Sequence, residues 1–103
     1  MRVWVGVDAD GLRRLRDGGA LGGEVVAAES EDEQHEYEAL VAAAEDGPVV
    51  VVADVETTDI DGATALADVT AADVEALHVD ADGSGQLAWY APQAIEAGLS
   101  LPG

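Results

Sequence analysis

A run dominated by valine begins at Val49, directly after Gly47 and Pro48, and continues to Val55. A continuous apolar run bounded by turn residues is typical of a strand that is covered on both faces of a sheet. Shorter strand patterns lie on either side of it, and the last two flank a Gly-rich turn that predicts a hairpin. These four are Arg2–Val7, Glu24–Ala28, Ala76–Asp80 and Gln86–Tyr90.

The clearest helical pattern covers Glu31–Glu45. Ser30 and Glu33 have the spacing of a capping box at its start. Apolar residues recur there with helical spacing and predict one buried face, formed by Tyr37, Leu40, Val41 and Ala44. A short helix is expected after a cap at Asp8 or Asp10, with Leu12 and Leu15 buried. Thr70 and Asp73 can cap a single turn, Glu56–Gly62 reads as a polar loop, and Pro92–Ala97 starts a last short helix.

The order of these elements predicts a single α/β domain over residues 1–103. We expect a mixed β-sheet of about five strands with two to three helices packed on it.

Charge is distributed very unevenly along this chain. The net charge is −18, and the four basic residues, Arg2, Arg13, Arg14 and Arg16, all precede residue 17. Such an excess of acid repels itself in a compact protein and is typical of proteins adapted to molar salt, which screens the repulsion. We therefore expect a cytoplasmic protein of a cell that keeps molar salt inside, and an acidic protein of an ordinary cell is the alternative.

Composition also excludes several classes of function. A surface this acidic disfavours nucleic-acid binding by bulk electrostatics. The chain has no cysteine, which excludes disulfides, thiolate metal ligands and a catalytic thiol. No secretory signal is expected, and the apolar runs are far shorter than the roughly 20 residues that span a bilayer.

Five short stretches carry a resemblance to a known group of proteins: Met1–Val5, Glu36–Leu40, Val50–Val55, Ala76–Asp80 and Leu87–Gln93. In these stretches the chain resembles a family of small single-domain proteins of high-GC bacteria that have no assigned function. The resemblance implies a shared fold and adds no site. This chain differs from the family in its acidity and in a shortened middle region.

A first candidate metal site is the turn that begins at Asp80. Asp80, Asp82 and Ser84, followed by an apolar residue at Leu87, match the opening of a calcium-binding loop. Position 12 of such a loop should be a glutamate and is Ala91 here. The alternative is an acidic hairpin turn with glycine where positive φ is needed.

A second candidate is a carboxylate pocket. If Arg2–Val7, Val49–Val55 and Ala76–Asp80 are parallel neighbours, their carboxyl ends bring together Asp8, Asp10, Asp54, Asp80 and Asp82. Clustered carboxylates suit Mg²⁺ and would permit phosphoryl transfer or hydrolysis. The absence of lysine and the high density of acids in the chain favour the alternative, in which these groups are ordinary surface carboxylates.

Both histidines have a functional and a structural interpretation. His35 shares a helix face with Glu31 and Glu38, which could hold a transition metal or form a solvated acidic face. His78 and Asp80 point to one face of their strand, as a catalytic base and its orienting acid would. No serine lies in a suitable nucleophile turn, so a hydrogen-bonded structural histidine is favoured.

The basic residues Arg13, Arg14 and Arg16 could bind a phosphate or an acidic partner, pair with the protein's own acids, or drive self-association. Trp89 and Tyr90 point to opposite faces of their strand. One of them is therefore expected to pack in the core while the other meets a helix or solvent. Core packing is the default, and Trp89 becomes an interface anchor if it is exposed near His78.

These observations favour a non-enzymatic binding or interaction module, either a homo-oligomer or one with a protein partner. The alternatives are a divalent-metal-dependent phosphoryl-transfer or hydrolytic domain and a calcium-stabilised structural module.

Overall fold

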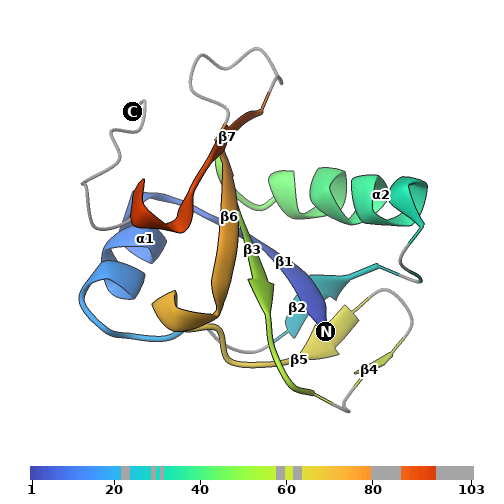
Figure 1. Ribbon diagram of the computed structural model, residues 1–103, viewed down its shortest axis with the longest axis horizontal. Helices are drawn as coiled ribbons and strands as arrows, with labels where there is room; N and C mark the ends of the chain where they lie inside the picture. The colour runs from blue at the N-terminus through green and yellow to red at the C-terminus, as the bar shows by residue number, and fades with distance from the viewer. Residues whose placement is uncertain are drawn as a thin grey trace.

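In the computed structural model, seven strands form one sheet in the order β4-β5-β2-β1-β3-β6-β7 (Figure 1). The structure describes residues 1–21, 24–28, 30, 32–57, 60–61, 64–79 and 87–94, and the strand count refers to these. The strands are β1 (Arg2–Val7), β2 (Glu24–Ala27), β3 (Val49–Asp54), β4 (Ile60–Asp61), β5 (Thr64–Leu66), β6 (Val74–Val79) and β7 (Ala88–Tyr90).

All pairs of neighbouring strands in this part of the chain are antiparallel. The α/β class is confirmed, whereas the mixed sheet of about five strands is wrong. β2 and β3 both run antiparallel to β1 and lie on either side of it, so the helix that connects them crosses over β1. β4 lies within the segment predicted as a polar loop, and β4 and β5 are too short to show an alternating pattern.

Both faces of the sheet are covered. The alternate residues Val49, Val51 and Ala53 of β3 belong to a large core with Leu12 and Leu15. Val50 and Val52 point to the other face, where they form a smaller core with Trp4, Ala39 and Ala43. The prediction of a strand buried on both sides is confirmed, since residues 49–53 are all buried.

Helix α1 (Ala9–Arg16) covers the face of the larger core. Its N-cap is Asp8, whose carboxylate Oδ1 accepts a hydrogen bond of 3.0 Å from the backbone N–H of Gly11. The chain leaves the helix through Gly18, which has a φ of 89°. Glycine adopts this left-handed conformation without steric cost, which allows the chain to turn away at the end of the helix.

Helix α2 (Glu33–Ala44) covers the opposite face of the sheet. Its N-cap is Asp32, which accepts a hydrogen bond from the backbone N–H of Gln34 at 2.9 Å, and the predicted cap at Ser30 is wrong. Ser30 instead accepts a hydrogen bond from the backbone N–H of Asp32 at 3.1 Å. The helix therefore begins two residues later than a cap at Ser30 predicts.

The buried face of α2 also differs from the prediction. Ala39 and Ala43 are its buried residues, while Tyr37 and Val41 are exposed. The reason is the close approach of α2 to β1 at Gly6, where a Cβ atom would overlap the carbonyl oxygen of Ala43. Only small side chains fit between the helix and the strand at this separation, so Tyr37 and Val41 are turned away from the sheet, while Leu40 and Ala44 are half-buried beside the smaller core.

The predicted hairpin of the last two strands is confirmed. β6 and β7 pair with Leu77 opposite Tyr90 and His78 opposite Trp89. A single 3₁₀ turn at Ala71–Asp73 follows Thr70, whose backbone N–H and Oγ1 both donate to Asp73, as predicted. The final predicted helix is a 3₁₀ turn over Pro92–Ala94, and the rest of it lies outside the described residues.

Candidate protein-binding groove

An open groove of about 990 Å³ lies between α2 and the β6–β7 hairpin. Its apolar wall consists of α2 side chains: Tyr37 and Val41, which are exposed, and Leu40 and Ala44, which also pack partly against the smaller core. His78 of β6 and Leu87 form the opposite side. The groove is lined by Tyr37, Leu40, Val41, Ala44, Glu45, Asp46, Gly47, Pro48, His78 and Leu87.

Large apolar side chains are exposed along this groove. Tyr37 is 65% exposed and Val41 45% exposed, and both line the groove. Trp89 is 63% exposed and stands directly opposite His78 in the β6–β7 ladder. Residues opposite each other in an antiparallel pair point to the same face, so Trp89 extends the apolar surface next to His78. Two of the four aromatic residues of the chain, Tyr37 and Trp89, are therefore largely exposed to solvent, one in the groove and one beside it.

Tyr90, next to Trp89, points to the other face of the sheet and packs against the larger core. The sequence left the roles of these two aromatic residues open. The structure assigns the buried role to Tyr90 and the exposed role, beside His78, to Trp89.

A smaller hollow of about 410 Å³ continues the groove toward the start of α2. It shares Tyr37, Leu40 and His78 with the larger groove. Its apolar lining comes from the core on this face, and its rim is acidic. The remaining lining residues are Arg2, Trp4, Glu33, Glu36, Val52, Glu75 and Ala76.

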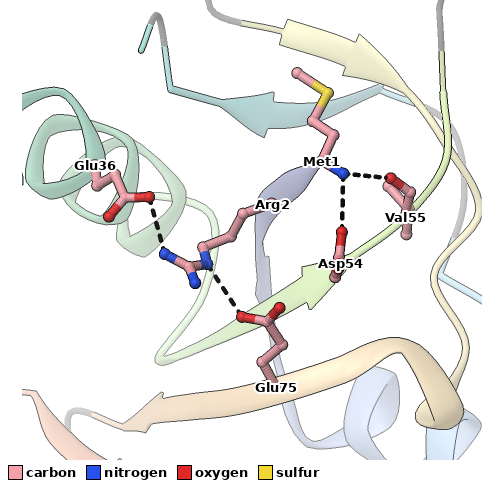
Figure 2. Close-up of polar contacts among 6 residues, drawn as sticks. All are labelled: Met1, Arg2, Glu36, Asp54, Val55 and Glu75. Carbon is pink, nitrogen blue, oxygen red and sulfur yellow. Dashed lines mark hydrogen bonds and ion pairs between the residues drawn. The ribbon is translucent and has the colours of Figure 1, made fainter. Parts of the chain in front are cut away.

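Arg2 stands at the end of this hollow and bridges two glutamates from different elements (Figure 2). Its Nη1 atom lies 2.9 Å from an oxygen of Glu36 on α2, and its Nε atom lies 3.0 Å from an oxygen of Glu75 on β6. The hydrogen bond to Glu75 is the main cause that raises the pKa of the Arg2 guanidinium. Arg2 is thus occupied in joining α2 to the sheet.

Asp54 has a similar structural role beside Arg2 (Figure 2). The amino group of Met1 donates to its Oδ1 atom and to the carbonyl oxygen of Val55, each at 2.8 Å. The hydrogen bond from this amino group, followed by its positive charge, lowers the pKa of the Asp54 carboxyl.

His78 is half-buried at the floor of the groove. Burial lowers the pKa of its imidazole, because desolvation disfavours the charged form. The groove floor is therefore neutral at neutral pH. Asp80, the predicted orienting acid, lies outside the described residues.

The parallel arrangement that would build a carboxylate pocket is absent from the sheet. Val7 pairs with Val49, and Arg2 pairs with Asp54, so Asp8 and Asp54 lie at opposite ends of the β1–β3 ladder. Asp10 forms an ion pair of 3.2 Å with Arg13. Asp80, Asp82 and Ser84 of the predicted metal sites lie outside the described residues. Within the described part of the chain, no three acidic or histidine side chains form a group that could hold a metal ion.

The remaining predicted residues lie apart from the groove. The Nδ1 atom of His35 is hydrogen-bonded to Oγ of Ser30 at 2.6 Å, and Glu31 is outside the described residues. The three arginines of α1 lie on the other side of the sheet. Arg16 pairs with Asp17 at 3.7 Å, and Arg14 has no ion pair within the described ranges.

None of the described helices has the length and apolarity needed to cross a membrane. No family model, no curated protein and no solved structure matches this chain.

Proposed function

We propose that this chain is a small, non-enzymatic interaction module that binds a segment of a partner protein in the groove between α2 and the β6–β7 hairpin. One observation carries the proposal: exposed Tyr37 and Val41 line a single groove, and exposed Trp89 stands opposite the groove residue His78 in the β6–β7 ladder. Contiguous exposed apolar surface on a monomer is characteristic of binding sites. Tyrosine and tryptophan are also the residues that most often dominate the energetics of protein interfaces.

The distribution of the other exposed apolar residues supports this choice of site. Ile60 and Leu66 are exposed at the opposite edge of the sheet, on β4 and β5. Ile60 is paired with Ala65, the neighbour of Leu66, so the two side chains point to opposite faces. They form no common surface, in contrast to the residues around the groove.

The acidity of the chain fits an apolar mode of binding. We propose that the protein works at molar salt, where the Debye length is about 3 Å and long-range attraction between charged surfaces is lost. Apolar contacts are not screened by salt, so an exposed Tyr–Val–Trp surface keeps its binding energy under those conditions. The proposal needs no metal and no reacting group.

The test is selection of peptides from a random displayed library in about 1 M KCl, followed by amide NMR mapping of the selected binders. We expect shifts in α2, β6 and β7, and loss of binding in Trp89→Ala and Val41→Ser. Leu66→Ser, an apolar-to-serine change at the opposite edge, is the matched control and should bind normally. Failure to select any binder, or binding that Leu66→Ser weakens as much as Val41→Ser, would refute the proposal.

A further inference from the structure

We infer that the segment bound in this groove has an apolar centre with a basic residue at each end. The inference rests on the proposed function and concerns the chemistry of the partner at the same site. It is drawn from the charges at the two ends of the groove, which have the same sign although its middle is apolar.

The first acidic end lies beside the start of α2. Three glutamates, Glu33, Glu36 and Glu75, line it together with one arginine. Arg2 bonds to Glu36 and Glu75, which leaves Glu33 without an ion pair among the described residues. The net charge of this end is therefore negative. Tyr37 adjoins it and offers an aromatic face, on which a lysine or arginine side chain packs favourably.

The second acidic end lies at the last turn of α2. Glu45, the C-cap residue, and Asp46 both line the groove there. A helix carries a partial negative charge at its C-terminus, so cations stabilise this position and anions destabilise it. The last turn of α2 has no basic residue. A cation from a partner would thus meet two carboxylates and the helix dipole at one point.

The distance between the two ends limits the length of the occupant. α2 has 12 residues and is about 18 Å long. An extended chain covers that distance in about five or six residues at roughly 3.4 Å each. The middle of the groove, lined by Leu40, Val41 and Ala44, then faces about four apolar residues of the partner.

The probes are two synthetic peptides with the same Leu-Ala-Leu-Leu centre. One has a lysine at each end, and the other has a glutamine in place of each lysine. Binding is measured by tryptophan fluorescence and by amide NMR in about 1 M KCl. At this salt concentration only charges in near contact act on each other. We expect the lysine peptide to bind at least about tenfold more tightly than the glutamine peptide.

Variants of the protein show which carboxylates cause the difference in affinity between the two peptides. Glu33→Gln and Glu45→Gln should each weaken binding of the lysine peptide by about three- to tenfold and leave the glutamine peptide unchanged. Asp68→Asn removes one exposed carboxylate that lines neither end, and it should change neither affinity. This control separates local charge from the overall charge of −18.

The outcomes test separately whether the groove binds a partner segment and whether that segment has basic ends. If the glutamine peptide binds as tightly as the lysine peptide, and Trp89→Ala abolishes the binding, the groove is a binding site but the inference is wrong. An equal effect of Asp68→Asn and Glu33→Gln also overturns the inference. If neither peptide binds, or if Trp89→Ala has no effect on binding, both are wrong.

Discussion

Replacing Gly6 by alanine should displace α2 from the sheet. The added Cβ would overlap the backbone carbonyl oxygen of Ala43 and come within 3.0 Å of Cβ of Asp46. Overpacking of this kind costs about 1–3 kcal/mol. The upper part of that range applies, because the obstructing atom belongs to the helix backbone and cannot rotate away. Alanine regains about 0.5–1 kcal/mol by restricting the unfolded chain, which leaves a net loss of about 2 kcal/mol.

Urea denaturation in about 2 M KCl measures this loss. With a slope of about 1 kcal/mol per M, the midpoint of Gly6→Ala should fall by about 2 M. In a Trp89→Ala background Trp4 is the single tryptophan, and it lies under α2 with Ala39 and Ala43. Displacement of the helix should shift its emission to longer wavelength in the folded protein.

Two further results bear on the reasoning. Adding Ala43→Gly to Gly6→Ala should not restore stability, because the overlap is with the carbonyl group and not with the side chain. A midpoint for Gly6→Ala within about 0.3 M of the parent, with Trp4 emission unchanged, would refute the close contact between α2 and β1.

Three other perturbations have defined outcomes. Raising KCl from about 0.1 M to about 1 M should raise the urea midpoint, since the Debye length falls from about 10 Å to about 3 Å, and an unchanged midpoint would contradict the charge argument. Glu45→Lys should stabilise the protein by about 0.5–1 kcal/mol at the lowest KCl concentration at which it folds, because it places a cation at the C-terminus of α2, and a lower midpoint would contradict this. His78 has a folded-state pKa below its ordinary 6.5, so the unfolded state takes up the proton first as the pH falls. The contribution of His78 to the free energy of unfolding is therefore fully present above about pH 6.5 and decreases below it. Between about pH 7.5 and about pH 5.5, the His78→Gln variant should lose less stability than the parent. Equal losses in the two proteins would show that His78 is not the titrating group.

The strands that depend on local pattern were predictable from the sequence. The run from Val49 predicts a strand covered on both faces, and the structure confirms it. Its direction relative to its neighbours was not predictable, because an antiparallel strand covered on both faces has the same apolar run as a parallel one. The proposed meeting of Asp8 and Asp54 depended on that direction and failed with it.

The groove was predictable only in part. The helical spacing of apolar residues predicted that Tyr37 and Val41 are buried, and both are exposed. The signal that could have corrected this is Gly6 together with Ala39 and Ala43, since small residues on a strand and on its crossing helix allow close approach. The contact of Gly6 with Ala43, 37 residues further along the chain, is a long-range contact that local periodicity does not contain.

The place of β1 in the sheet determines when the domain can fold during synthesis. β1 is made first but lies at the centre, between β2 and β3. Its pairing with β3 joins Arg2 to Asp54, so half of the chain must be made before the central ladder can close. Long-range pairing of this kind slows folding, because the conformational entropy of the intervening chain is lost before the stabilising contacts form. β2 can pair with one edge of β1, but the other edge of this central strand stays unpaired until β3 emerges from the ribosome. The acids that follow Asp17 give the chain made by then a net negative charge, and repulsion between like charges opposes association of such chains.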